Sequence, residues 1–124
     1  MVILTIHGNP PSKSNQYRVR AMVQKGKKPR AILYKSAELK SYEKSFIEEI
    51  PENCKVDMIG DLNMAVVCYF SSRRPDVDNA AKSILDCLQK GGVIRNDRSV
   101  MKLTLIKELD KDNPRVDIAI KRIR

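Results

Sequence analysis

The sequence predicts an α+β fold in which helices pack on a mixed β-sheet. Segments 2–7 and 61–70 alternate apolar and polar residues, as half-buried strands do. Segments 36–50 and 76–90 repeat apolar residues at helical spacing. The order is strand, basic excursion, helix, strand, helix, strand, strand, which fits one α+β layer. With 124 residues, we expect a single domain over residues 1–124.

The first third of the chain combines a strand with a long basic excursion. Val2–His7 predicts a strand, and Pro10-Pro11 stops it because proline has no N–H for a ladder. The polar stretch from Lys13 to Arg30 predicts a long surface excursion of the chain. A two-stranded ribbon with Gly26 near its tip is one form that this excursion can take. Residues 31–34 then return as a short strand.

Two helices and three strands are expected in the remainder. Ser36 is placed to cap a helix that ends before Pro51, and Asp61–Phe70 is the clearest strand. Asp76 or Asp78 caps a second helix, which Gly91-Gly92 stops. Two further strands follow, over residues 100–109 and 115–123, separated by a polar turn.

Charge is distributed unevenly along the chain. The net charge is +9, from 24 Lys and Arg against 15 Asp and Glu. Residues 1–37 hold eight basic side chains and no acid, whereas the other 87 residues hold 16 bases and 15 acids. The eight are Lys13, Arg18, Arg20, Lys25, Lys27, Lys28, Arg30 and Lys35. An excess of this kind indicates a polyanion partner, nucleic acid or a membrane surface.

Several classes of protein and site are excluded. No apolar run approaches the roughly 20 residues that span a bilayer, and the opening segment is not a secretory signal. Three widely spaced cysteines without a C-x-x-C motif argue against a disulfide scaffold or a zinc ribbon, and favour the cytoplasm. His7 is the one histidine, and its alternating run marks it as a strand residue. A catalytic metal must therefore be held by oxygen ligands.

The candidate chemistry lies in the segment from Arg73 to Lys82. Asp76 and Asp78 stand two apart at a strand–helix junction, where the helix dipole favours negative charge. An ordinary N-cap with a charged first turn is the alternative interpretation. Lys82 lies one helical turn past Asp78 and suits a leaving oxygen or a phosphate, although an i,i+4 helix pair explains it equally. Arg73 and Arg74 suit phosphate contacts, and a solvated loop would carry them too.

Asp97 is a third acid, and the sequence leaves undecided whether it lies close to the first two. From Asp78 to Lys90 a helix rises about 18 Å, and residues 91–97 cover about 21–25 Å when extended. Asp97 therefore reaches the pair only if its segment runs straight back along the helix. A second subunit of a dimer could supply Asp97 instead. Converging carboxylates suit magnesium, which activates water and stabilises charge in phosphodiester hydrolysis.

These motifs together resemble the RusA family of Holliday junction resolvases. The resemblance rests on R-R-P-D-V-D-N-x-x-K, on G-G-V-I-R-N-D-x-x-V, and on the P-P-S-K-S-N-Q-Y-R opening. Tyr34-Lys35-Ser36 is similar too, and the likeness runs from the first strand to about Ile106. Many members have two consecutive acids in the last motif, whereas this chain has Asn96 before Asp97.

The resemblance implies a homodimeric, magnesium-dependent endonuclease that cuts four-way DNA junctions by paired nicks, with manganese as a substitute ion. By position, Asp76, Asp78 and Asp97 match the metal-binding acids, and Lys82 matches the catalytic lysine. The N-terminal bases, together with Arg73 and Arg74, are expected to hold DNA. A non-catalytic nucleic-acid-binding module, and a nuclease of the same fold that acts on other branched DNA, are the alternatives.

Overall fold

A four-stranded mixed sheet forms the base of the molecule. The computed structural model describes residues 1–11, 17–23 and 25–123. The sheet has the order β1-β6-β4-β5, with β1 at Val2–His7, β4 at Leu62–Phe70, β5 at Val100–Leu109 and β6 at Arg115–Arg122. β6 is antiparallel to both of its neighbours, whereas β4 and β5 run parallel. The mixed sheet and its helices confirm the predicted α+β class.

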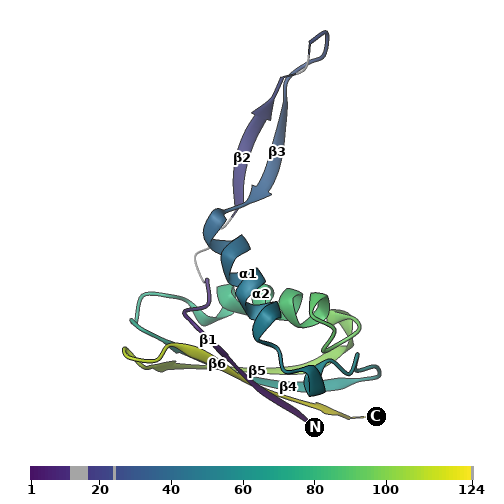
Figure 1. Ribbon diagram of the computed structural model, residues 1–124, viewed down its shortest axis with the longest axis vertical. Helices are drawn as coiled ribbons and strands as arrows, with labels where there is room; N and C mark the ends of the chain where they lie inside the picture. The colour runs from purple at the N-terminus through teal and green to yellow at the C-terminus, as the bar shows by residue number, and fades with distance from the viewer. Residues whose placement is uncertain (12–16, 24, 124) are drawn as a thin grey trace.

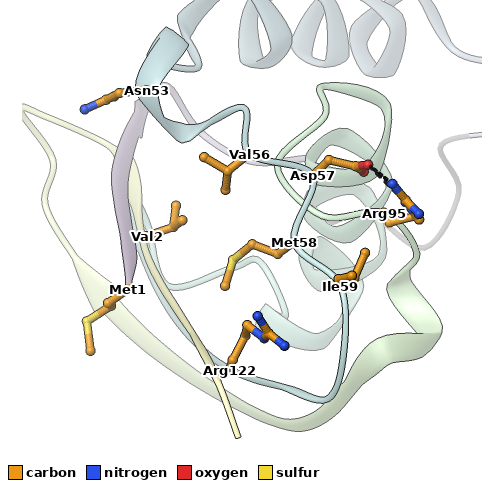
Figure 2. A pocket seen from close by; sticks show the side chains of 9 residues that line it. All are labelled: Met1, Val2, Asn53, Val56, Asp57, Met58, Ile59, Arg95 and Arg122. Atoms are coloured by element: carbon orange, nitrogen blue, oxygen red, sulfur yellow. Dashed lines mark hydrogen bonds and ion pairs between the residues drawn. The ribbon is translucent and has the colours of Figure 1, made fainter. Parts of the chain in front are cut away.

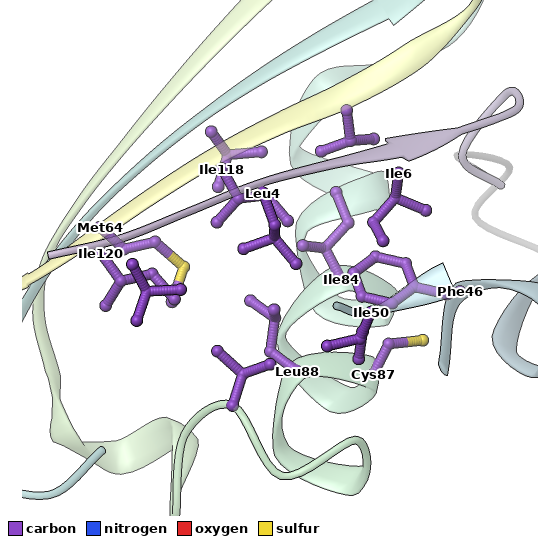
Figure 3. Close-up of a cluster of buried hydrophobic side chains, with 14 of the residues drawn as sticks. Leu4, Ile6, Phe46, Ile50, Met64, Ile84, Cys87, Leu88, Ile118 and Ile120 are labelled. Carbon is purple, nitrogen blue, oxygen red and sulfur yellow. The ribbon is translucent and has the colours of Figure 1, made fainter. Parts of the chain in front are cut away.

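Helices α1 (Ala37–Glu49) and α2 (Val77–Lys90) lie on one face of this sheet (Figure 1). Every second residue of β4, from Leu62 to Phe70, is buried toward the helices. These side chains meet Phe46 of α1 and Ile84 and Leu88 of α2 in one apolar core (Figure 3). Removing this apolar surface from water is the main contribution to the stability of the fold.

The helix boundaries follow the signals in the sequence. The Ser36 hydroxyl accepts a hydrogen bond from the Leu39 N–H (3.2 Å), so Ser36 caps α1 as predicted. α1 ends ahead of Pro51, and a short 3-10 turn, η1 (Glu52–Cys54), follows. Gly91 ends α2, and a Cβ at this position would clash with the Ile50 side chain. A larger residue at this position would require the end of the buried Ile50 side chain to move.

The basic excursion forms an antiparallel hairpin of β2 (Tyr17–Met22) and β3 (Arg30–Lys35). The ribbon is as predicted, and β3 is one residue longer at each end than expected. Gly26 has φ +79° in the turn, a conformation that glycine adopts readily. The hairpin projects away from the sheet and helices (Figure 1). Since an isolated hairpin is marginally stable in water, its attachment to the body matters.

Glu43 of α1 provides that attachment. Its carboxylate, largely buried, accepts hydrogen bonds from the Lys35 ammonium at 2.8 and 2.9 Å. Lys90 of α2 approaches the same carboxylate at 3.4 Å. One acid thus joins the foot of the hairpin to both helices.

The cysteines and the histidine occupy defined places in the described structure. Cys54, Cys68 and Cys87 are all buried and unpaired. His7 lies on β1 with its side chain exposed, and its ring and backbone N–H both contact the Glu49 carboxylate. In the part of the chain that the structure describes, no helix is long and apolar enough to cross a membrane.

Candidate active site

The loop between β4 and α2 carries the first two acids. It runs from Ser71 to Pro75, and Asp76 occupies the N-cap position of α2 with extended backbone angles. The Asp76 side chain makes no capping hydrogen bond and is exposed. Asp78 is also exposed, and its carboxylate accepts a hydrogen bond from the Asn79 N–H (3.1 Å). Asp76 thus occupies the N-cap position, as predicted, but its carboxylate makes no hydrogen bond to the helix.

Basic residues flank this carboxylate pair along the chain. Arg73 and Arg74 are exposed on the loop immediately before Asp76, and Lys82 is exposed one turn after Asp78 on α2. The free N–H groups at the start of α2 add a partial positive charge. The site therefore combines two carboxylates with an environment that attracts phosphate.

Asp97 lies at the other end of α2. It begins the short 3-10 turn η2 (Asp97–Ser99), and its N–H donates to the Gln89 side-chain oxygen (2.9 Å). Gln89 is eleven residues beyond Asp78, which corresponds to about 16 Å of helix. The Val93 N–H returns to the Leu88 carbonyl (2.9 Å), and the Met58 N–H bonds the Val93 carbonyl (2.9 Å). These bonds keep the segment after α2 at the helix C-terminus.

The straight return that would bring Asp97 to Asp76 within one chain is thus not found. Across the described ranges, no group of three His, Cys, Asp or Glu side chains lies close enough to hold a metal ion. Asn96 stands where the motif before η2 often has a first acid, and its side chain stabilises this turn. Its side-chain oxygen accepts a hydrogen bond from the Arg98 N–H (3.0 Å).

The predicted DNA-binding bases fall in two places. Lys25, Lys27, Lys28 and Arg30 are exposed at the far end of the hairpin, and Arg73 and Arg74 are exposed beside the acids. Lys13 lies outside the described residues, as do the side chains of Arg18 and Arg20. The bases thus separate into a group on the projecting hairpin and a group at the site.

Two residues that hold the acid-bearing loop, Ser71 to Pro75, were not predicted from the sequence. The Asn9 side chain accepts a hydrogen bond from the Ser71 N–H and donates one to the Ser71 hydroxyl, both at 3.0 Å. The Lys107 ammonium donates to the carbonyl oxygens of Arg73 and Pro75. Neither residue belongs to a local motif that would have indicated this role.

A separate pocket opens at the opposite end of β4 (Figure 2). Its volume is about 570 Å³, and its one ion pair joins Asp57 to Arg95 at 2.6 Å. It is lined by Met1, Val2, Asn53, Val56, Asp57, Met58, Ile59, Arg95 and Arg122. None of the predicted site residues lines it, so the pocket is distinct from the candidate active site.

Comparison with known proteins defines the class as a nuclease, a hydrolase that acts on DNA. The family model described as endodeoxyribonuclease RusA matches residues 8–121, and the chain belongs to this family. A crossover junction endodeoxyribonuclease RusA from Aquifex aeolicus (strain VF5) is 31% identical over 114 residues. That match covers 90% of this chain and 84% of the relative. The likeness therefore includes the last strand, beyond the motifs quoted above.

Proposed function

We propose that this chain forms a homodimeric, magnesium-dependent endonuclease that resolves four-way DNA junctions by paired symmetric nicks. Membership of the RusA family supports the activity of a Holliday junction resolving endonuclease. Nucleases of this family depend on a divalent metal ion. The observation that carries the proposal is the Asp76 carboxylate, which is exposed at the start of α2 and makes no capping bond. An acid that does not cap its helix is available to a cation.

Asp76 and Asp78 of one subunit, together with Asp97 of the partner subunit, would hold the ion. The donor set fits, since magnesium prefers carboxylate oxygens and keeps several waters. When bound, the ion lowers the pKa of a coordinated water and stabilises negative charge on the phosphate oxygens. Lys82 is exposed one turn after Asp78 on α2 and is assigned to the scissile phosphate or the leaving oxygen.

The edge of the sheet supports the dimer. β5 is the last strand, so one side of its ten residues lacks a strand neighbour within the described chain. Met101, Leu103, Ile106 and Leu109 are exposed on it. A long apolar edge is a template for pairing with another chain unless something covers it. We infer that the two β5 strands pair antiparallel about a two-fold axis.

The direction of β5 makes this pairing relevant to the site. Because β4 and β5 are parallel, the loop that leads to Asp76 lies at the carboxyl end of both strands. Asp97 precedes the amino end of β5. In an antiparallel pair the amino end of one strand lies beside the carboxyl end of the other. Asp97 of the partner subunit would thus approach Asp76 from across the edge.

The basic hairpin is assigned to DNA binding. Its exposed lysines and arginine are assigned to the DNA backbone, and Arg73 and Arg74 to phosphates near the cut. Two copies related by a two-fold axis present two equivalent sites, as paired cuts in a four-way junction require. Because phosphate contacts release counterions, junction binding should weaken steeply with salt.

The cytoplasm is the proposed location. Three buried, unpaired cysteines are compatible with a reducing compartment. DNA as the substrate supports the same assignment.

Incubating a labelled four-way junction with the protein, with and without magnesium, tests this function. The wild type should give symmetric nicks only with the ion, and Asp78→Asn should bind the junction without cutting it. Asp86→Asn, a matched change further along α2, should cut normally. Binding without nicks under all conditions would favour a non-catalytic DNA-binding module. Preferential cutting of flaps over junctions, in competition with linear duplex, would favour a nuclease for other branched DNA.

A further inference from the structure

Lys107 of β5 reaches beyond its own strand to the acid-bearing loop. Its ammonium donates to the Arg73 carbonyl oxygen at 2.6 Å and to the Pro75 carbonyl oxygen at 2.5 Å. The same ammonium lies 5.9 Å from the centre of the Phe70 ring. It forms no salt bridge to any carboxylate of the described chain, so carbonyl dipoles are the partners of its charge.

The position of these two carbonyls explains what the contact does. The Pro75 carbonyl belongs to the peptide group that joins Pro75 to Asp76. Because a peptide group is planar, fixing this carbonyl limits the direction in which the Asp76 side chain leaves the backbone. The contact also draws the loop from the end of β4 over β5, which is the edge strand. Asp76 is thereby held on the side of the sheet where the proposed partner subunit approaches.

Asn9 holds the other end of the same loop. Its side-chain oxygen accepts from the Ser71 N–H and its side-chain nitrogen donates to the Ser71 hydroxyl, both at 3.0 Å. Asn9 is itself placed by the bond from the Gly8 N–H to the Pro114 carbonyl oxygen (2.9 Å). The first residue of the loop is thus tied by Asn9 and the last by Lys107. The residues between them are exposed.

We propose that Lys107 and Asn9 are positioning residues that set the divalent-ion affinity of the site by holding the loop that presents Asp76. This inference rests on the proposed function, because it assumes that Asp76 is a metal ligand. Residues that orient metal ligands typically change metal affinity by about 10–100-fold when they are removed. Most of the exposed bases assigned to DNA lie on the hairpin, so junction binding without metal should weaken much less than metal binding.

The test uses the full chain and manganese as the probe. Lys107→Met keeps the length and apolar stem of the side chain and removes both hydrogen bonds. Calorimetric titration with manganese, without DNA, should show about 10–100-fold weaker binding than wild type. The magnesium concentration for half-maximal junction cleavage should rise in parallel, while metal-free junction binding should weaken much less than manganese binding. Lys107→Arg, which keeps a charged donor, should recover most of the affinity. Lys102→Met on the same strand is the matched control and should titrate like wild type.

Manganese binding by Lys107→Met within about twofold of wild type would overturn the proposal. If that variant does not fold, Asn9→Ala decides: an unchanged manganese affinity in a folded Asn9→Ala protein overturns it equally. If the proposed function itself is wrong, a different result is expected: Asp76→Asn will bind manganese as tightly as wild type does. Loss of manganese binding in Asp76→Asn together with full binding in Lys107→Met refutes the positioning role alone.

Discussion

The side-chain oxygen of Gln89 accepts a hydrogen bond from the backbone N–H of Asp97 at 2.9 Å. This bond ties the third acid to the C-terminal end of α2, whereas Asp76 and Asp78 stand at its N-terminal end. The two ends are about 16 Å apart along the helix. A site that needs all three acids would therefore draw them from two chains, which is the basis of the proposed dimer.

Replacing Gln89 should weaken metal binding without affecting the fold. Gln89→Leu removes the acceptor, so the turn that presents Asp97 loses one fixed point at a cost of about 1 kcal/mol. We expect about a tenfold higher magnesium requirement for cleavage, measured by titrating the ion against nicking rate. Gln89→Glu keeps an oxygen acceptor and should restore part of the loss. An unchanged magnesium requirement in Gln89→Leu would show that this bond does not present Asp97 to the site.

Charges on the β5 edge should separate the subunits. The double change Leu103→Lys and Leu109→Lys places lysines on the exposed edge strand, where two copies would repel one another. Light scattering should show at least tenfold weaker dimerisation, and junction cleavage should fall with it. Ile3→Lys on β1, the opposite edge of the sheet, is the matched control. If Ile3→Lys dissociates the dimer and the β5 variant does not, the interface is the β1 edge.

Neutralising Glu43 should loosen the foot of the hairpin. Glu43→Gln removes the charge that pairs with Lys35 and Lys90, and leaves two ammonium groups near a neutral amide. Because both lysines are partly exposed, we expect a loss of about 1–2 kcal/mol in the free energy of unfolding. Hydrogen exchange of the β2 and β3 amides should accelerate more than that of β4. Glu48→Gln, exposed on the same helix, should leave exchange unchanged, and equal exchange in both variants would refute the anchoring role.

The buried thiols should make stability fall at high pH. Burial raises the pKa of Cys68 to about 11 and that of Cys87 to about 12, from an ordinary value of 9.0. Above pH 9 the unfolded chain releases thiol protons that the folded chain retains. The free energy of unfolding therefore keeps its full value below pH 9 and falls as the pH rises above it. Urea unfolding should show a loss of about 1–3 kcal/mol between pH 8 and pH 10, and Cys87→Ala should reduce this slope. A stability that does not fall over this range would contradict the thiol assignment.

Local patterns in the sequence were sufficient for most elements of the fold. The alternation in β4 and the cap at Ser36 depend on neighbours along the chain, and both were predicted. The parallel pairing of β4 with β5 was not predicted, because strand order depends on contacts between distant segments. The sequence also placed Asp76 and Asp78 together, because only Val77 lies between them in the chain.

The supports of the site could not be predicted for the same reason. Asn9 and Ser71 are 62 residues apart, and Lys107 and Arg73 are 34 apart. No spacing rule links such pairs. The location of Asp97 depended on whether residues 91–96 return along α2 or stay at its end, and chain length allowed both. Hydrogen bonds to Gln89 and Leu88 decide this in the structure.

Mixing two inactive variants tests the shared metal site most directly. Asp78→Asn and Asp97→Asn should each be inactive alone, because every site in either homodimer lacks one acid. When the two chains are unfolded together and refolded as a mixture, half of the dimers should be hybrid. Each hybrid would contain one site with all three acids, so about a quarter of wild-type sites should recover. The mixture should therefore give single nicks in four-way junctions. Complete inactivity of a mixture shown to contain hybrid dimers would contradict a site that takes Asp97 from the partner subunit.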